Sequence, residues 1–326
     1  MKTPALRVRN LKVAFQGAEG PELAVGGISF DLFAGEMVGL VGESGCGKSV
    51  TARALMGLID SRVADVSLSS LQLAGTELSG LNRHGWQTVR GKAMVMVFQE
   101  PATALDPVFT IGYQIVCVLR RHRNISKPQA KQTTLKALES CGFSNPENVF
   151  EAYPHQLSGG MRQLALIALA MVTRPNVLIA DEPTTALDVS TQSLVLEQLK
   201  RLREENNTAI LLITHDLGVV AQSCSRAMVM YCGKLVEQSS YADLFHHARH
   251  PYTQGLLDSI PRITAGGKAY AKPIPGRVPS CTEYPPGCHF AERCNRADKL
   301  CRDNYPAIRH MRESLVACHH PLGSGP

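Results

Sequence analysis

Apolar residues along the chain form two patterns that predict strands. Residues 6–15 (LRVRNLKVAF) and 28–33 (ISFDLF) alternate apolar and polar side chains, which is typical of half-buried antiparallel strands. Residues 37–41 (MVGLV), 176–181 (NVLIAD) and 208–214 (TAILLIT) are short apolar runs separated by helical pattern, which indicates strands buried on both faces. The sequence therefore predicts an α/β fold with a parallel core sheet and a set of antiparallel strands.

A helical insertion interrupts this strand pattern. Residues 110–121 have helical periodicity, and Ser126 and Gln129 have the spacing of a capping box at the start of the next helix. We therefore expect a helical subdomain at about residues 100–172.

The C-terminal residues differ in composition from the rest of the chain. From Pro261 onward Pro, Gly, Cys and Arg predominate, so we expect a large domain over residues 1–260 and a small cysteine-containing region over residues 261–326. The net charge of the chain is +6, and this region holds ten Lys or Arg against five Asp or Glu. Such a basic tail is compatible with binding to nucleic acid, anionic lipid or an acidic partner, and with simple solvation.

Nothing in the sequence predicts a membrane span or a secretion signal. The longest apolar runs, residues 93–98 and 166–172, are far shorter than the roughly 20 residues that a span requires. The first ten residues, MKTPALRVRN, lack the apolar core of a signal peptide. We therefore expect a cytosolic protein whose membrane role would depend on a partner.

Residues 42–49 (GESGCGKS) match the phosphate-loop pattern G-x-x-x-x-G-K-[ST], between a predicted strand and a helical pattern. The glycines let backbone N–H groups surround a phosphate at the positive end of the helix. Lys48 would contact the β and γ phosphates, and the Ser49 hydroxyl would bind magnesium. The predicted ATP-binding residues of this segment are Gly42, Glu43, Ser44, Gly45, Cys46, Gly47, Lys48, Ser49, Val50 and Thr51.

The apolar run that ends in IADEP places two carboxylates at the end of a predicted strand. Asp181 would hold magnesium, directly or through water, and Glu182 would polarise the attacking water. These carboxylates and the phosphate loop together leave kinases, GTPases, helicases and transport ATPases open.

Further motifs in a fixed order narrow this range. They are Phe15, Gln99 in MVFQEP, LSGGMRQ at residues 157–163, ALD at residues 186–188, and His215 in LLITHD. Together with the two motifs above they resemble the ATP-binding-cassette (ABC) family, from residue 4 to about residue 260. The resemblance implies a P-loop NTPase fold of the ABC type, with a parallel core sheet, an antiparallel β subdomain and a helical subdomain.

The resemblance also implies roles for single residues. Phe15 would stack on adenine, although an aromatic residue at the end of such a strand is often part of a core. Gln99 would reach magnesium or the lytic water. His215 would contact the γ phosphate and orient Glu182 and the water.

The glycines of the LSGGMRQ segment precede a helical pattern far from the phosphate loop. Ser158, Gly159, Gly160 and Met161 would form a second anion site from a capping serine, exposed N–H groups and the helix dipole. In the ABC family this segment covers the γ phosphate of the other subunit, so two nucleotides are held between two cassettes. ATP would then favour a closed dimer, with Asp188 at its interface, and hydrolysis would open it.

The last 75 residues or so resemble the tails of the oligopeptide and dipeptide importer branch. The resemblance rests on HPYTQGLLDSIP at 250–261, PGRVPS at 275–280 and PPGCHFAERC at 285–294, and related nickel and opine importers carry similar tails. The resemblance implies a candidate [4Fe–4S] site in this region. Zinc and free thiols are the alternatives, and zinc is disfavoured because the cysteine spacing lacks the C-x2-C pairs of zinc sites. The candidate ligands are Cys288, Cys294, Cys301 and Cys318, with His289 and His319 as competitors and Cys281 outside the usual pattern.

These observations predict an ATPase subunit of an ABC importer on the cytoplasmic face of a bacterial plasma membrane. The resemblance of the tail favours di- or oligopeptides as the imported solute. Its cofactors would be ATP and Mg²⁺. By resemblance its partners would be two membrane permeases, a second cassette (a paralogue or a second copy) and an extracytoplasmic solute-binding protein. Nickel, opine or glutathione import, a nucleic-acid-associated ABC ATPase and a non-hydrolysing regulatory cassette are the alternatives.

Overall fold

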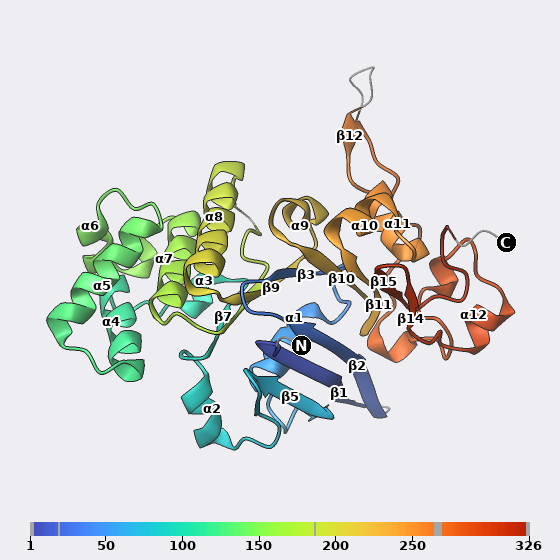
Figure 1. The fold of residues 1–326 in the computed structure, drawn as a ribbon, viewed down its shortest axis with the longest axis horizontal. Coiled ribbons are helices and arrows are strands. Elements are labelled where there is room, and N and C mark those ends of the chain that lie inside the picture. Colours follow the sequence, from blue (N-terminus) through green and yellow to red (C-terminus); the bar gives the residue numbers. More distant parts are fainter. Residues whose placement is uncertain (1–2, 19, 186, 264–268, 324–326) are drawn as a thin grey trace. The chain divides into compact units, whose positions relative to one another are not determined.

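The computed structural model describes residues 3–18, 20–185, 187–263 and 269–323. The chain folds as two compact units, each built from discontinuous segments. The first unit comprises residues 1–7, 31–37 and 72–212, and the second comprises residues 8–30, 38–71 and 213–326. Both units combine strands with helices (Figure 1), so the α/β class predicted from the sequence is confirmed.

The first unit contains three neighbouring strands in the order β9-β8-β7. These are β7 (Met94–Val97), β8 (Val177–Asp181) and most of β9 (Ala209–Thr214). Strands β7 and β8 run parallel, and every residue of β8 and β9 is buried. The continuous apolar runs are therefore strands covered on both faces, as the sequence predicts.

A group of helices forms the remainder of the first unit. They are α4 (Ile111–His122), α5 (Lys127–Ser140), α6 (Pro146–Glu151), α7 (Gly159–Val172) and α8 (Val189–Asn206). Helix α5 packs against α4, α6 and α7, and α7 packs against α8 (Figure 1). Ser126 caps α5, and Gln129 returns a hydrogen bond in a complete capping box. The shorter elements of this unit are β6 (Thr76–Glu77), α2 (Arg83–Val89), α3 (Pro101–Ala104) and η1 (Pro154–Gln156).

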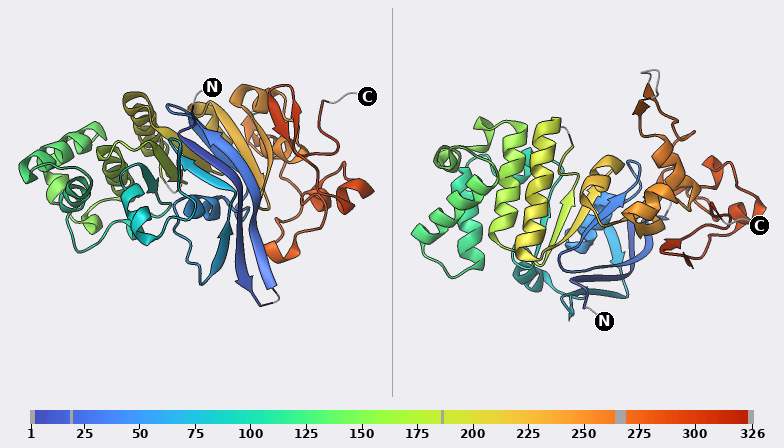
Figure 2. Two further views of the ribbon diagram at one scale, coloured as in Figure 1. Left: turned by 60° about the horizontal axis from the view of Figure 1, so that its bottom comes forward. Right: turned by 45° about the horizontal axis from the view of Figure 1, so that its top comes forward.

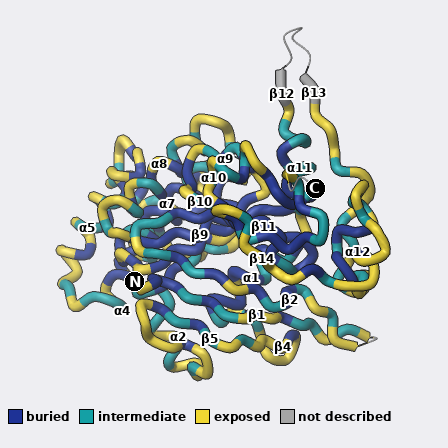
Figure 3. The backbone as a smooth tube through the Cα atoms, turned by 45° about the vertical axis from the view of Figure 1, so that its right-hand side comes forward, coloured by how far each residue is buried: buried dark blue, intermediate teal, exposed yellow. Residues whose placement is uncertain are grey.

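The second unit carries a sheet in the order β14-β15-β11-β10-β3. Its strands are β3 (Met37–Val41), β10 (Arg226–Tyr231), β11 (Lys234–Ser240), β14 (Arg309–Met311) and β15 (Ser314–Val316). Strand β10 is parallel to β3, and the pairs β10·β11, β11·β15 and β14·β15 are antiparallel. Figure 3 shows β10 and β11 as buried backbone. Two short strands of the C-terminal region thus extend this sheet, which the composition of that region did not predict.

Antiparallel strands form a second layer in this unit. They are β1 (Leu6–Gly17), β2 (Gly20–Leu32) and β4 (Ala64–Ser67), with β5 (Ser70–Leu73) following. Strand β1 lies between β2 and β4, and β1 and β2 form the long pair seen in Figure 2. Buried side chains alternate along β1, but the alternation shifts by one residue at Asn10. Asn10 has a left-handed φ of 53°, which is typical of a bulge that holds one extra residue.

The other elements of the second unit surround these strands. They are α1 (Lys48–Leu55), α9 (Leu217–Ser223), α10 (Tyr241–His246), α11 (Pro251–Asp258), β12 (Arg262–Ile263), β13 (Ala269–Tyr270), η2 (Cys281–Glu283), η3 (Ala291–Arg293) and α12 (Lys299–Asp303). An aromatic cluster of Tyr231, Tyr252 and Phe290 joins the C-terminal region to β10, with ring centroids 4.5–5.3 Å apart. Among the described residues, no helix combines the length and apolar character needed to cross a membrane.

Candidate functional site

The phosphate loop joins β3 to α1, as the sequence predicts. Gly47 precedes α1 with a left-handed φ of 102°, which glycine adopts without strain. A side chain at Gly42 would place its Cβ 2.2 Å from the carbonyl oxygen of Met230, so only glycine fits there. These glycines allow the backbone to turn tightly before the positive end of α1, where anions bind favourably.

Lys48 lies against the loop with 5% of its surface exposed. Its Nζ donates to the carbonyl oxygens of Gly42, at 2.8 Å, and of Glu43, at 3.0 Å. Burial raises the pKa of the neighbouring Cys46 thiol, whose Sγ lies 3.7 Å from the Lys48 Nζ. The ammonium group is therefore fixed at the loop backbone, where a bound phosphate would meet it.

The remaining loop residues differ in exposure. Ser44 and Gly45 are exposed at the tip, Ser49 and Val50 are half-buried, and Thr51 is buried. The Thr51 hydroxyl donates to the carbonyl oxygen of Gly47 at 2.9 Å and so ties α1 to the loop.

Two other predicted residues belong to the same unit as the loop. Phe15 is half-buried near the end of β1, opposite Ala64 on β4. His215 is exposed between β9 and α9. Asp216 caps α9 by accepting the Gly218 N–H at 2.7 Å, which fixes the backbone beside His215.

Glu182 and Gln99, which lie far apart in the sequence, come together in the first unit. The Gln99 Nε2 donates to the Glu182 Oε2 at 3.1 Å. The Thr185 hydroxyl donates to the same oxygen at 2.8 Å, a contact that the motif did not reveal. Glu182 has a left-handed φ of 48° and is 9% exposed, and Asp181 ends β8 with 3% exposed. The unit thus places two buried carboxylates and an amide at the end of a buried strand.

The LSGGMRQ segment begins α7. Ser158 is the capping residue, and its Oγ accepts the Met161 N–H at 3.3 Å. Ser158 and Gly159 are exposed, and a Cβ added to Gly159 would have no neighbour within 4 Å among the described residues. A Cβ on Gly160 would lie 2.7 Å from the Thr191 methyl group of α8. This helix end is therefore open on the side of Gly159 and closed on the side of Gly160.

Asp188 caps α8 beside this segment. Its carboxylate accepts the Thr191 N–H at 2.9 Å and the Thr191 hydroxyl at 2.7 Å, and it also bonds to Ser190. The Ser190 and Thr191 hydrogen bonds hold the pKa of Asp188 well below its usual range. Ala186, at the start of the ALD turn, lies outside the described residues.

The sequence similarity to known proteins covers almost the whole chain. Residues 25–185 match the family described as ABC transporter, and residues 236–301 match the oligopeptide/dipeptide transporter C-terminal region. The oligopeptide transport ATP-binding protein AppD of Bacillus subtilis is 46% identical over 96% of this chain and 95% of its own length. The chain belongs to the ABC transporter family. The dipeptide transport ATP-binding protein DppD of Haemophilus influenzae is 43% identical over 97% of this ABC subunit and 96% of its own length.

Solved ABC cassettes share the fold. A dimeric ATP-binding cassette in a post-hydrolysis state, bound to ADP and phosphate, superposes with a TM-score of 0.66. It is 24% identical over 72% of this chain and 98% of its own. The cbiO1 protein of Clostridium perfringens gives a TM-score of 0.64 at 23% identity, over 76% of this chain and 92% of its own. At this level of identity the likeness concerns the fold.

The C-terminal region of this ABC subunit brings together the four cysteines singled out in the sequence. Cys288, Cys294, Cys301 and Cys318 line one small pocket with about 10 Å³ of free space. Burial raises the pKa of Cys288 to about 11 and that of Cys318 to about 12. These two thiols are therefore protonated at neutral pH unless a cation binds them.

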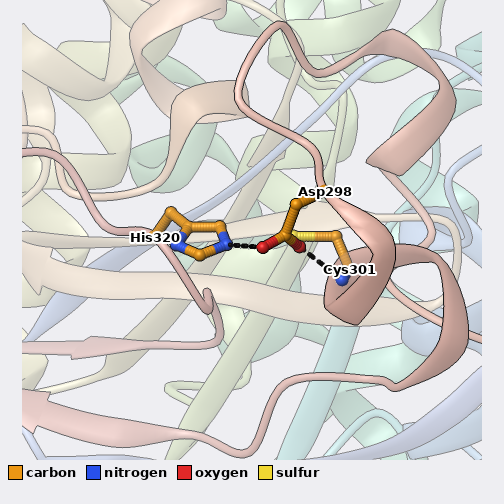
Figure 4. A group of neighbouring side chains, drawn as sticks. All are labelled: Asp298, Cys301 and His320. Atoms are coloured by element: carbon orange, nitrogen blue, oxygen red, sulfur yellow. Dashed lines mark hydrogen bonds and ion pairs between the residues drawn. The ribbon is translucent and has the colours of Figure 1, made fainter.

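Three side chains of this region also form a tighter group. The ligand atoms of Asp298, Cys301 and His320 all lie within 4.8 Å of one another (Figure 4). The His320 Nε2 lies 2.9 Å from the Asp298 Oδ2, and Asp298 accepts the Cys301 N–H at 3.0 Å. The sequence did not single out His320 or Asp298, because neither has a motif spacing.

The competing residues named from the sequence have other contacts. The His289 Nδ1 lies 2.8 Å from the carbonyl oxygen of Cys232, and the His319 Nε2 lies 3.0 Å from that of Asn304. Cys281 lies 3.3 Å from Glu22, and it is not among the residues that line the cysteine pocket. The sequence also missed His250, a fully buried histidine in the wall of that pocket.

Proposed function

We propose that this chain hydrolyses ATP to power the import of peptides, as one nucleotide-binding subunit of an ABC importer. The proposal rests on the two hydrogen bonds that Gln99 and Thr185 donate to the Glu182 carboxylate, in a chain with a complete phosphate loop. A carboxylate fixed at the end of a buried strand suits a group that polarises a water molecule. The names of the relatives, which describe oligopeptide and dipeptide transport, support the peptide part of the proposal.

Each residue then has a separate task. The loop N–H groups and Lys48 bind the phosphates, and Phe15 packs on the adenine. Ser49, Gln99 and Asp181 would hold Mg²⁺, which neutralises charge on the phosphates when it is bound. Glu182 polarises the water, and His215 orients it against the γ phosphate.

The exposed end of α7 supports a second proposal about the assembly. Ser158, Gly159, Gly160 and Met161 would cover the γ phosphate bound by a second cassette, with Asp188 near that interface. No atom of the described residues lies within 4 Å of a Cβ added at Gly159, so a phosphate could approach the helix end closely. The second cassette would be a paralogue or another copy of this chain.

A groove in the helical part of the first unit supports docking of the membrane permeases. It has a volume of about 530 Å³ and includes Tyr113, Val116 and Phe150. Val108, Phe109 and Tyr113 leave 68%, 42% and 51% of their surfaces exposed, and the last two rings stack. An exposed apolar patch of this kind suits docking of a helix from one of the two permease subunits. Such docking would hold the chain at the cytoplasmic face of the plasma membrane.

The transported solute meets other proteins first. An extracytoplasmic solute-binding protein and the permeases would select it, and nickel, opine or glutathione are the alternatives to peptide. Purification with the cognate permeases and binding protein, followed by a ligand screen, tests this part. Stimulation of ATP hydrolysis by a peptide is the expected result, and stimulation only by one of the other solutes would reassign the substrate.

We also propose that Cys288, Cys294, Cys301 and Cys318 hold a [4Fe–4S] cluster. Four sulfurs on one zinc ion would lie about 4 Å from one another, whereas the ligand atoms found within 4.8 Å of one another among the described residues are those of Asp298, Cys301 and His320, with one of the four cysteines. A cluster separates its thiolates more widely, because each binds a different iron. When bound, it would tie together a region with little apolar core.

His250 supports this fit. Its Nδ1 accepts the Tyr252 N–H at 3.0 Å, so its proton lies on Nε2. That Nε2 is buried in the pocket wall and has no hydrogen-bond partner among the described residues. An N–H donor of this kind suits a sulfide or thiolate of a cluster.

Anaerobic purification with iron, sulfide and zinc assays tests the cluster. We expect about four irons per chain from the cluster stoichiometry and a loss of visible absorbance in Cys288→Ser, with Cys117→Ser as the control. Zinc without sulfide would overturn this assignment.

The rival to the whole proposed function is a nucleic-acid-associated ABC ATPase, which a salt-dependent mobility shift with duplex DNA would favour. Phosphate release by the purified subunit excludes a non-hydrolysing regulatory cassette.

A further inference from the structure

Glu43 places a negative charge inside the phosphate loop. It is the second residue of GESGCGKS, directly after Gly42, and its carbonyl oxygen accepts a hydrogen bond from Lys48. Its carboxylate therefore belongs to the loop that would surround the phosphates, where like charges are felt strongly. Unless a cation neutralises it, this carboxylate repels a nucleoside triphosphate.

Arg293 of the C-terminal region supplies that cation. Its Nη1 lies 2.8 Å from one carboxylate oxygen of Glu43, and its Nη2 lies 3.0 Å from the other, in a two-pronged ion pair. The arginine side chain is 5% exposed, and its Nε donates to the carbonyl oxygen of Pro275 at 2.8 Å. Its guanidinium also lies 5.8 Å from the ring centroid of Tyr231. The Glu43 side chain is 30% exposed, but a bidentate pair with a buried arginine fixes geometry as well as charge, so the carboxylate is held in one orientation.

Tyr252 of α11 fixes the backbone of the same residue. The Glu43 N–H donates to the Tyr252 hydroxyl at 2.9 Å, and Tyr252 itself is fully buried. Its ring packs on Tyr231 and Phe290. Both the side chain and the amide of Glu43 are therefore oriented by residues that lie beyond position 250.

Both supports come from segments that also enclose the cysteine pocket. Arg293 directly precedes Cys294, and Tyr252 follows His250 by two residues. Cys294 and His250 both line that pocket. The structure of the cysteine region and that of the phosphate loop are thus coupled through Glu43.

We propose that Arg293 and Tyr252 are positioning residues for ATP, through which the C-terminal region sets the affinity of the phosphate loop for nucleoside triphosphates. This inference rests on the ATP binding proposed above, but not on hydrolysis or on the nature of the transported solute. It gives the C-terminal region a direct part in the nucleotide site.

The first experiment measures the dissociation constants of ATP and ADP, with a fluorescent analogue as the displaced probe, in the full-length protein. Arg293→Met should weaken ATP binding by about tenfold, the scale of one charge-assisted hydrogen bond. ADP, which carries less charge, should be affected less. Arg293→Lys keeps the charge without the fork and should fall between Arg293→Met and the parent. The matched control is Arg203→Met, because Arg203 pairs with Glu204 on α8.

The second experiment separates charge neutralisation from a general structural role. In the double variant Arg293→Met with Glu43→Gln, the repelling carboxylate is gone, so ATP affinity should recover to within about threefold of the parent. Tyr252→Phe removes one hydroxyl and keeps the packing, so it tests the second support if Arg293→Met does not fold. It should weaken ATP binding about threefold to tenfold, the range for one lost hydrogen bond.

Unchanged ATP affinity in both Arg293→Met and Tyr252→Phe would overturn the inference. So would a double variant that binds ATP as weakly as Arg293→Met. If the protein binds ATP with this arginine dependence but does not release phosphate, the proposed hydrolysis fails while the inference stands.

Discussion

At the scale of single residues, Glu182 is held in an uncommon backbone conformation. A left-handed φ is rare outside glycine and costs about 1 to 3 kcal/mol. The hydrogen bonds from Gln99 and Thr185 orient the carboxylate in this conformation. Such strain is retained where the orientation of one side chain matters, which agrees with a role in polarising water.

Glu182→Gln should therefore abolish hydrolysis while ATP still binds. The amide cannot accept a proton from water, so the rate of phosphate release should fall by at least about 100-fold. ATP affinity should stay within about threefold, and ATP should then stabilise the closed dimer, which light scattering detects. Glu197→Gln, on the exposed face of α8, is the control. A normal rate in Glu182→Gln would remove Glu182 from its proposed role.

The sequence specifies some of these residues and not others, for a physical reason. Lys48 and Glu182 lie in short motifs whose chemistry depends on neighbours a few positions away. The pairing of Glu43 with Arg293 joins residues 250 positions apart, and the helical count or strand period of either segment carries no sign of it. Thr185 is a similar case, because a threonine after a strand has many other roles.

At the scale of elements, the start of α7 is built to expose its N–H groups. Ser158 caps the helix, Gly160 lies against Thr191 of α8, and a Cβ added at Gly159 would meet no atom of the described chain within 4 Å. The helix end is therefore capped within one chain, and Ser158 and Gly159 are exposed at its surface.

Gly159→Asp should separate folding from function. The helix dipole stabilises an acidic residue in the first turn, and a Cβ at this position contacts none of the described residues, so the melting temperature should not fall. The same charge should repel the phosphate bound by the partner cassette and lower ATP hydrolysis by at least about tenfold. Differential scanning fluorimetry and phosphate release provide the two measurements. Full activity in Gly159→Asp would exclude contact between this helix end and a phosphate.

Periodic segments were predictable at this scale, and short ones were not. The runs that became β3, β8 and β9, and the capping box of α5, have patterns several residues long. Strands β14 and β15 have three residues each, too few for any period; β15 forms on the edge of β11, and β14 pairs in turn with β15. The boundary expected near residue 260 stays a prediction, since β15 pairs with a strand that precedes it.

At the scale of the whole molecule, the buried His250 links stability to pH. Burial lowers the pKa of His250 to about 3, whereas an unfolded histidine has a pKa of about 6.5. Below pH 6.5 the unfolded chain therefore binds a proton that the folded chain does not. Stability contributed by neutral His250 is present above that pH and is lost as the pH falls toward 3.

The free energy of unfolding should thus fall by about 2 kcal/mol between pH 7 and pH 5 on account of His250. Urea denaturation at both pH values measures this difference. The contribution should vanish in His250→Gln and persist in His84→Gln, since His84 is an exposed histidine on α2. An equal pH dependence in the parent and in His250→Gln would show that other groups are responsible.

The burial of Cys46 in the phosphate loop determines how this thiol reacts with oxidants and labelling reagents. Because Cys46 is enclosed and stays protonated, it is a poor nucleophile toward peroxides and alkylating reagents. The exposed Cys117 on α4 reacts more readily by comparison. A maleimide dye should therefore label Cys117 well before Cys46, which would place a fluorescent reporter on the helical part of the first unit while the phosphate loop stays unlabelled.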